Sequence, residues 1–129
     1  MVNLIICVSF FYILHLFLTM TFSLHRVPFV NWTHAGGDIS NMTDLSIRLS
    51  QASDNLRQSL PVFLVLAILS IDATNALENI FLAKIWFGLR IAYLLGAFVN
   101  LYKIPMVRPV IWLPSVVIMV MMGINLCMN

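Results

Sequence analysis

The sequence predicts an all-α integral membrane protein, a four-transmembrane-helix bundle that forms one domain over residues 1–129. Three observations support this fold class: 61% of the residues are hydrophobic, only 9% are charged, and the mean hydropathy is +0.98. About a quarter of the residues in a soluble domain are charged, so lipid must be the solvent for much of this surface. Four apolar segments also each approach the ~20 residues that cross a bilayer core.

The spans are expected at about 2–24, 58–77, 80–102 and 109–127. The first is predicted to be a retained helix, because it has no basic leader and is longer than the apolar core of a signal peptide. A polar, irregular loop is expected over 25–45, which is rich in Gly, Asn, Asp, Ser and Thr. The second helix should start at an N-cap, Asp44 or Ser46, before it enters lipid, and Pro61 should kink it there.

Basic residues concentrate at one predicted end of the bundle. The connections after the first and third spans carry Arg26, Arg48, Arg57, Lys103 and Arg108. The opposite end offers Lys84 together with the acidic Asp72 and Glu78. The positive-inside rule therefore predicts that both termini lie on the non-cytoplasmic side. The net charge of +2, without any basic run, excludes a nucleic-acid partner.

A polar stripe precedes the second span. Arg48, Ala52, Asn55 and Gln58 have the spacing that puts residues on one helical face. The stripe is either a solvated juxtamembrane face or one wall of a hydrogen-bonding site at the membrane boundary. Because the apolar part of this span is short, we expect a bound polar ligand or a second copy of the chain to cover the stripe.

Arg90 lies inside the third span, where a charged side chain costs at least about 2.5 kcal/mol on insertion scales. Tyr93, Ala97 and Asn100 share its helical face. One interpretation makes Arg90 an anion clamp or charge stabiliser in a ligand pocket. The other makes it a structural arginine, paired with carbonyls or a carboxylate inside the bundle.

Other polar or small residues within the spans are interpreted as packing features. Gly88, Ala92 and Gly96 form a row of small residues that predicts close approach of another helix. His15 is expected to be a buried interhelical hydrogen-bonding residue. No metal site is expected, because Cys7 and Cys127 are far apart and neither has a nearby histidine.

Three ordered patterns now suggest a family. They are R-x3-A-x2-N-x2-Q-x2-P at Arg48–Pro61, R-x2-Y at Arg90–Tyr93 and I-P-x2-R at Ile104–Arg108. Together with the four-span topology they resemble the MAPEG family, the membrane-associated proteins in eicosanoid and glutathione metabolism, and its small bacterial members in particular. The resemblance covers roughly residues 45–126.

This resemblance implies a homotrimer in a lipid bilayer, such as the bacterial inner membrane, with glutathione bound between protomers near the cytoplasmic side. It assigns cofactor binding to Arg48, Asn55, Gln58, Arg90 and Arg108, and catalytic thiolate stabilisation to Arg90, Arg108 and Tyr93. The implied activity is that of a glutathione transferase or peroxidase acting on lipophilic substrates.

Four departures from the family pattern favour an alternative. Gln58 stands where the family usually has Glu, Ala97 where a Tyr is expected, and Asp54 where eukaryotic members often have Arg. The segment from Arg90 to Pro105 is also a few residues longer than is typical. The alternative is a catalytically inactive MAPEG-like protein, a structural or accessory subunit of a larger membrane complex.

Overall fold

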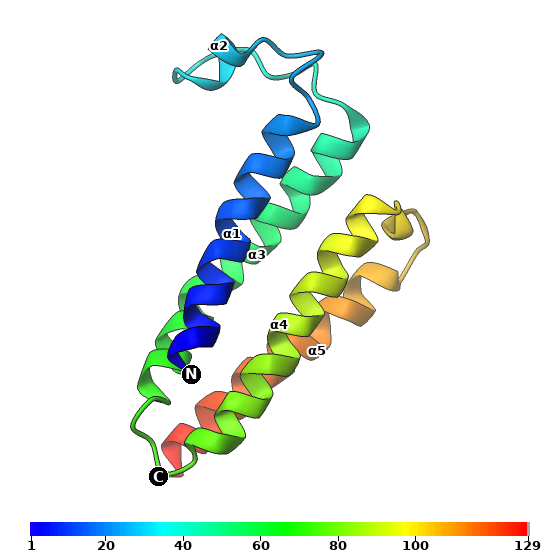
Figure 1. The fold of residues 1–129 in the computed structure, drawn as a ribbon. Coiled ribbons are helices and arrows are strands. Elements are labelled where there is room, and N and C mark those ends of the chain that lie inside the picture. Colours follow the sequence, from blue (N-terminus) through cyan, green and yellow to red (C-terminus); the bar gives the residue numbers. More distant parts are fainter. Residues whose placement is uncertain (129) are drawn as a thin grey trace.

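The computed structural model describes residues 1–128, of which most are helical and none forms a strand. In chain order the elements are α1 (Val2–Thr21), α2 (Phe29–Trp32), α3 (Asp44–Leu69), α4 (Ala76–Phe98), the 3-10 helix η1 (Leu101–Lys103) and α5 (Val107–Cys127). The long helices run alternately up and down the bundle, with α1 beside α3 and α4 beside α5 (Figure 1). The predicted all-helical bundle is confirmed.

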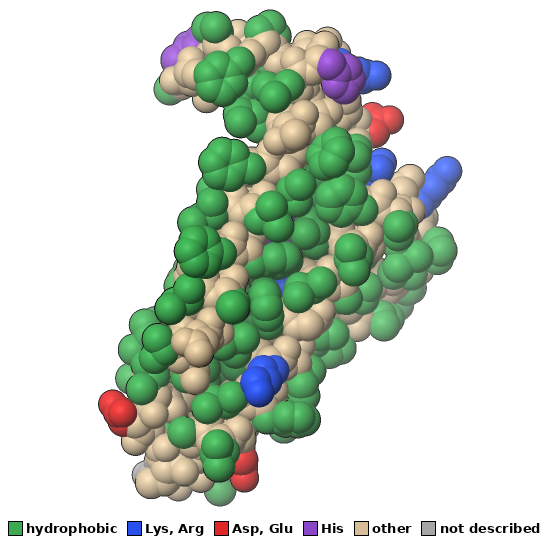
Figure 2. All heavy atoms as spheres, viewed as in Figure 1, with side chains coloured by type: hydrophobic (Ala, Val, Ile, Leu, Met, Phe, Trp, Pro, Cys, Tyr) green, Lys and Arg blue, Asp and Glu red, His purple; other side chains and the backbone are tan. Residues whose placement is uncertain are grey.

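Three of the long helices, α1, α4 and α5, are long and apolar enough to cross a membrane. The first half of α3 is polar, and only its part from Leu60 onward is mainly apolar. Hydrophobic side chains cover much of the face shown in Figure 2, and charged side chains gather mostly toward its two ends. The protein is therefore an integral membrane protein, as the composition predicts.

The predicted second span, 58–77, is wrong at its C-terminal end, because α3 stops at Leu69. The chain leaves the helix at Ser70, whose buried hydroxyl accepts a hydrogen bond from Nδ2 of Asn79 at 2.8 Å. This contact ties the start of α4 to the end of α3, and α4 already begins at Ala76.

The predicted third span, 80–102, begins and ends about four residues too late, since α4 runs from Ala76 to Phe98. Asn100 has a φ of 57°, in the left-handed region that commonly ends a helix. The following residues form η1 and turn back toward α4. By contrast, α1 and α5 match the predicted first and fourth spans closely.

Helix α3 begins at Asp44, and the residue that caps it is Thr43, one position before the predicted cap Asp44 and three before the other candidate, Ser46. The Thr43 hydroxyl oxygen accepts a hydrogen bond from the Ser46 backbone N–H at 3.1 Å. The Ser46 hydroxyl then donates to the Thr19 carbonyl at 2.8 Å, which fixes α3 against α1. The helix continues through Pro61.

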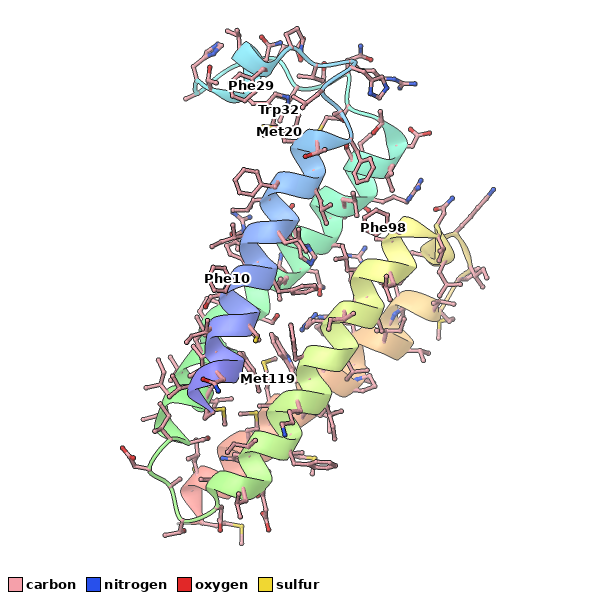
Figure 3. All side chains as sticks on the ribbon, in the orientation of Figure 1. Phe10, Met20, Phe29, Trp32, Phe98 and Met119 are labelled. Atoms are coloured by element: carbon pink, nitrogen blue, oxygen red, sulfur yellow. The ribbon has the colours of Figure 1, made fainter. Side chains whose placement is uncertain are left out.

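The segment expected to be an irregular loop, 25–45, contains one helical turn, α2. Figure 3 labels Phe29 and Trp32 on this turn, close to Met20 at the end of α1. Val27 is buried at 1% exposure. The segment therefore packs in part against the end of the bundle.

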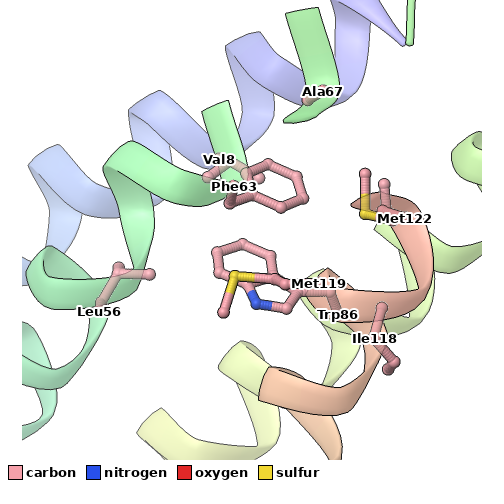
Figure 4. Close-up of a cluster of buried hydrophobic side chains, with 9 residues drawn as sticks. Val8, Leu56, Phe63, Ala67, Trp86, Ile118, Met119 and Met122 are labelled. Atoms are coloured by element: carbon pink, nitrogen blue, oxygen red, sulfur yellow. The ribbon is translucent and has the colours of Figure 1, made fainter. Parts of the chain in front are cut away.

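The main core lies where all four long helices meet (Figure 4). Its buried members are Val8, Leu56, Phe63, Ala67, Ala83, Trp86, Ile118, Met119 and Met122. The rings of Phe63 and Trp86 are stacked, with centroids 3.9 Å apart and planes 8° from parallel. A second buried cluster, Leu49, Ala52, Tyr93, Leu94 and Ala97, packs α3 against α4 near the basic end.

Two packing predictions need correction. His15 is buried as expected, but among the described residues neither ring nitrogen has a hydrogen-bond partner, and the ring instead packs edge-on against Phe11. Of the small-residue row, Gly96 is buried, whereas Gly88 and Ala92 are exposed in the protomer. The row therefore does not pack as a unit against another helix of the same chain.

Candidate functional site

Polar groups from α3, α4, η1 and α5 converge at the basic end of the bundle. The contributing segments are the first half of α3, the second half of α4 and the start of α5, which follow from the antiparallel arrangement of these helices. Thr43 and Ser46 hold the N-terminal turn of α3 in place, and the cluster around Leu49 and Tyr93 packs it against α4. Residues that are far apart in the sequence therefore line one region.

Arg90 is buried at 3% exposure and binds a side chain of α3. Its Nη1 donates to Oδ1 of Asn55 at 2.5 Å, and its guanidinium carbon lies 5.0 Å from the centroid of the Trp86 ring. A desolvated cation over an indole face is stabilised by about 2 kcal/mol. Nε and Nη2 of Arg90 have no hydrogen-bond partner among the described residues. Arg90 therefore sits as a buried cation, fixed by a neutral amide and an aromatic ring.

Arg108, in the first turn of α5, binds the hydroxyl of Tyr93 on α4. Its Nε donates to that oxygen at 2.8 Å, and Tyr93 is almost completely buried whereas Arg108 is exposed. Because Tyr93 accepts this bond, its own O–H remains available to donate. The terminal nitrogens of Arg108 make no hydrogen bond within the described part of the chain. The pair thus presents a cation and a hydroxyl donor side by side.

A cavity of about 280 Å³ opens beside this pair. Its lining residues are Arg48, Gln51, Ala52, Tyr93, Asn100, Tyr102, Lys103 and Arg108. Three of them are cations and none is acidic. Arg48 is held in place because its Nε donates to the Ala97 carbonyl at 3.0 Å. The cavity is therefore suited to a ligand with more than one negative charge.

A second cavity of about 330 Å³ is lined by Asn55, Gln58, Arg108, Pro109 and Trp112. Arg108 therefore lines both cavities. Trp112 and Pro109 give the second cavity an apolar wall, while the amides of Asn55 and Gln58 supply its polar side. We call the two cavities together the Arg108 site.

The predicted site residues are distributed as follows. Arg48, Tyr93 and Arg108 line the first cavity, and Asn55, Gln58 and Arg108 line the second. Arg90 lines neither cavity and lies in the interior, bound to Asn55.

The site predicted from the sequence did not include Lys103 or Tyr102. Both lie on η1, and the structure brings them to the first cavity. A polar and aromatic turn directly before Pro105 was the available signal. Burial raises the pKa of the Tyr102 hydroxyl above its ordinary value, so this group stays a neutral donor.

No group of three His, Cys, Asp or Glu side chains among residues 1–128 could hold a metal ion. The ion pair found in that range joins Asp54 to Arg57 at 3.1 Å on the exposed face of α3. Asp54 lines neither cavity of the Arg108 site, and Arg57 partly offsets its charge.

The family model of the MAPEG family matches residues 4–128, essentially the whole chain. No curated protein and no solved structure gives a significant match. The match extends the resemblance beyond the three motifs to α1 and to the end of α5. The chain therefore belongs to the MAPEG family, integral membrane proteins of the type found in glutathione and eicosanoid metabolism.

Proposed function

We propose that this protein binds glutathione, or a related anionic thiol, at the Arg108 site and transfers it to a lipophilic electrophile. The observation that carries the proposal is the 2.8 Å contact between Nε of Arg108 and the Tyr93 hydroxyl, in a cavity that Arg48 and Lys103 also line. Glutathione has two carboxylates, which these cations complement, and a thiol that the Arg108–Tyr93 pair can receive.

The chemistry depends on the thiolate. A free thiol has a pKa of about 8.5, and a neighbouring cation lowers it, which raises the thiolate fraction at neutral pH. Arg108 supplies the charge and the free O–H of Tyr93 supplies a hydrogen bond to the sulfur. The sulfur lone pair forms a bond to an electrophilic carbon, the electrons of the carbon–leaving-group bond depart with the leaving group, and the thiol proton passes to water.

The second cavity supplies a place for the electrophile. Trp112 and Pro109 form an apolar wall on the other side of Arg108, at the start of a membrane-spanning helix. A lipophilic substrate can reach this wall from the bilayer. Arg108 thus stands between the anionic thiol and the apolar substrate, where the bond must form.

The proposal includes a homotrimer with the ligand between protomers. Both cavities lie at the surface of the protomer, and Gln51, Gln58 and Arg108 are exposed there. Gly88 and Ala92 are small and exposed on α4, which allows another copy to approach closely. We place the basic end on the cytoplasmic side of a bacterial inner membrane, where reduced glutathione is available.

One observation favours a second candidate, an inactive accessory subunit of a membrane complex. Arg90 is already engaged by Asn55 and Trp86 inside the protein, and Gln58 offers a neutral amide rather than a carboxylate to the amino group of glutathione. Under this alternative the polar side chains at the basic end only hold the helices together and bind no ligand. Stoichiometric copurification of another membrane protein in mild detergent, without thiol binding, would favour it.

The test compares glutathione with ophthalmate, the same tripeptide with a methyl group in place of the thiol. Purified protein in detergent is titrated with each by thermal shift, since a ligand that binds the native state raises the unfolding temperature. Arg108→Gln should weaken glutathione binding at least about tenfold, the loss of about one charge-assisted hydrogen bond. Arg57→Gln is the matched control, because Arg57 lies outside both cavities.

Retained glutathione binding in Arg108→Gln, or no stabilisation of the wild-type protein at millimolar glutathione, would contradict the proposal. Equal affinity for glutathione and ophthalmate, together with no conjugate formed from a lipophilic electrophile, would leave binding without catalysis and favour the accessory role.

A further inference from the structure

The segment from Asn100 to Met106, which we call the strap, joins α4 to α5 and folds back over the end of α4. Left-handed residues bound it on both sides, with φ values of 57° at Asn100 and 73° at Met106. Such values are uncommon for residues other than glycine. The chain turns back from α4 to α5 between these two residues, and Tyr102 lies on the surface of α4 at Gly96.

The Tyr102 ring packs against α4 at Gly96, which has no side chain. A Cβ built on Gly96 would lie 2.7 Å from the Tyr102 hydroxyl oxygen and 2.9 Å from the adjacent ring carbon. Any larger residue at position 96 would displace the tyrosine ring. By contrast, a Cβ on Gly88, two turns earlier in the same helix, would meet nothing within 4 Å. The absence of a side chain at Gly96 therefore leaves the space that the Tyr102 ring occupies.

Tyr102 holds Tyr93 from two directions. Its hydroxyl donates to the Tyr93 carbonyl at 2.5 Å, and the two ring centroids are 4.7 Å apart with an interplanar angle of 34°. The Tyr102 ring therefore blocks one side of the Tyr93 ring. The Tyr93 hydroxyl points instead to Nε of Arg108. The strap, α4 and α5 are joined through these three side chains.

We infer that Tyr102 is a positioning residue for the Arg108 site: it fixes the Tyr93 hydroxyl on Arg108, and Gly96 provides the space that this requires. The inference rests on the proposed thiol chemistry, because the pair it positions is the one that receives the sulfur. The strap thereby affects the reactivity of the bound thiol through Tyr102, which does not itself contact the sulfur.

The first test uses Tyr102→Phe, with Tyr12→Phe as the matched control because Tyr12 lies on α1, away from the site. The readout is the pH midpoint at which bound glutathione becomes a thiolate, followed by its ultraviolet absorbance. Arg48, Lys103 and Arg108 face the same cavity and are unchanged in both variants. Tyr102→Phe should raise the midpoint by about half a pH unit or more, and Tyr12→Phe should not move it.

Steady-state rates give the second readout. Tyr102→Phe should lower kcat about tenfold while KM for glutathione stays within about twofold, since positioning acts on the reacting pair and not on the carboxylate contacts. Gly96→Ala should reproduce this pattern although residue 96 has no polar side-chain atom. Gly123→Ala, on α5, is its control, because a Cβ on Gly123 would meet only the Leu66 side chain at an ordinary distance of 3.7 Å, and this variant should behave like the wild type.

The outcomes separate the two proposals. If the wild-type protein forms no bound thiolate, both the proposed function and this inference are wrong. If the wild-type protein forms one and Tyr102→Phe titrates like Tyr12→Phe, only the positioning role is overturned. A lower unfolding temperature with an unchanged midpoint and kcat would likewise show that Tyr102 merely stabilises the strap. Should Gly96→Ala fail to fold, the Tyr102→Phe comparison decides alone.

Discussion

Arg90 and Asn55 form a buried hydrogen bond of 2.5 Å that joins α4 to α3. The arginine is the only cation of the bundle's interior among the described residues, and the amide is its one hydrogen-bonding partner there. Trp86, stacked on Phe63, covers the guanidinium. This contact links the polar end of the bundle to its apolar core, so removing it should lower the free energy of unfolding.

We predict that Asn55→Ala lowers the free energy of unfolding by about 3 kcal/mol, because a buried guanidinium is left without its acceptor. Asn55→Asp should restore most of this loss by placing a carboxylate beside the cation. Gln58→Ala, one turn further along α3 and exposed, is the control and should change stability by less than about 0.5 kcal/mol. Unfolding by dodecyl sulfate in mixed micelles measures all three. Equal stability of Asn55→Ala and Gln58→Ala would contradict the prediction.

A second prediction concerns Asn79, at the opposite end of the bundle. Its Nδ2 donates to the Ser70 hydroxyl at 2.8 Å, and its Oδ1 accepts from Nδ2 of Asn125 at 3.1 Å, so it ties α3 and α5 to α4. Because Asn79 is completely buried, Asn79→Ala should cost about 2–3 kcal/mol in unfolding free energy. Asn3→Ala, exposed on α1, is the control.

The affinity for glutathione tests whether the two ends of the molecule are independent of each other. Asn79→Ala should leave it unchanged at temperatures where the variant is folded, because the Arg108 site lies at the other end of α4. A parallel loss of affinity would show that the two ends are coupled.

The fold and the position of the site were predictable from the sequence to different extents. Apolar runs predict helices, and the spacing of Arg48, Asn55 and Gln58 predicts one face, since both depend on local periodicity. The end of α3 was not predictable, because it depends on a contact between Ser70 and Asn79 that forms only when two helices meet.

The contacts within the site were equally inaccessible to sequence reasoning. Arg90 and Arg108 both looked like ligand-binding cations, yet helix rotation buries the first and exposes the second. The pairing of Arg108 with Tyr93, rather than with a residue on its own helix, depends on the path of the strap, and two left-handed residues determine that path. The periodicity of the sequence gives no information on the rotation of the helices or on the path of the strap.

The predicted orientation can be tested with the chain's own thiols. Cys127 ends α5 at the same end of the bundle as the N-terminus, and both Cys127 and Cys7 are free and exposed. In a Cys7→Ser background, a membrane-impermeant maleimide should label Cys127 in intact cells, because the positive-inside rule places this end outside. In a variant without native cysteines, Asn41→Cys in the 25–45 loop should be labelled only after permeabilisation. The reverse pattern would invert the topology.

The last prediction concerns alkaline pH and follows from the strap. Burial, and then the neighbouring Tyr93, raise the pKa of Tyr102 above its ordinary value of 10.0. The folded state therefore holds this proton more tightly than the unfolded state does. The resulting stabilisation is complete below the ordinary pKa and is lost as the pH rises toward the raised value. The unfolding temperature of the wild-type protein should thus fall more steeply above about pH 10 than that of Tyr102→Phe, which has no hydroxyl to ionise. Tyr12→Phe should keep the wild-type slope, and identical slopes in all three proteins would show that the Tyr102 hydroxyl is not buried against Tyr93 in the membrane-embedded molecule.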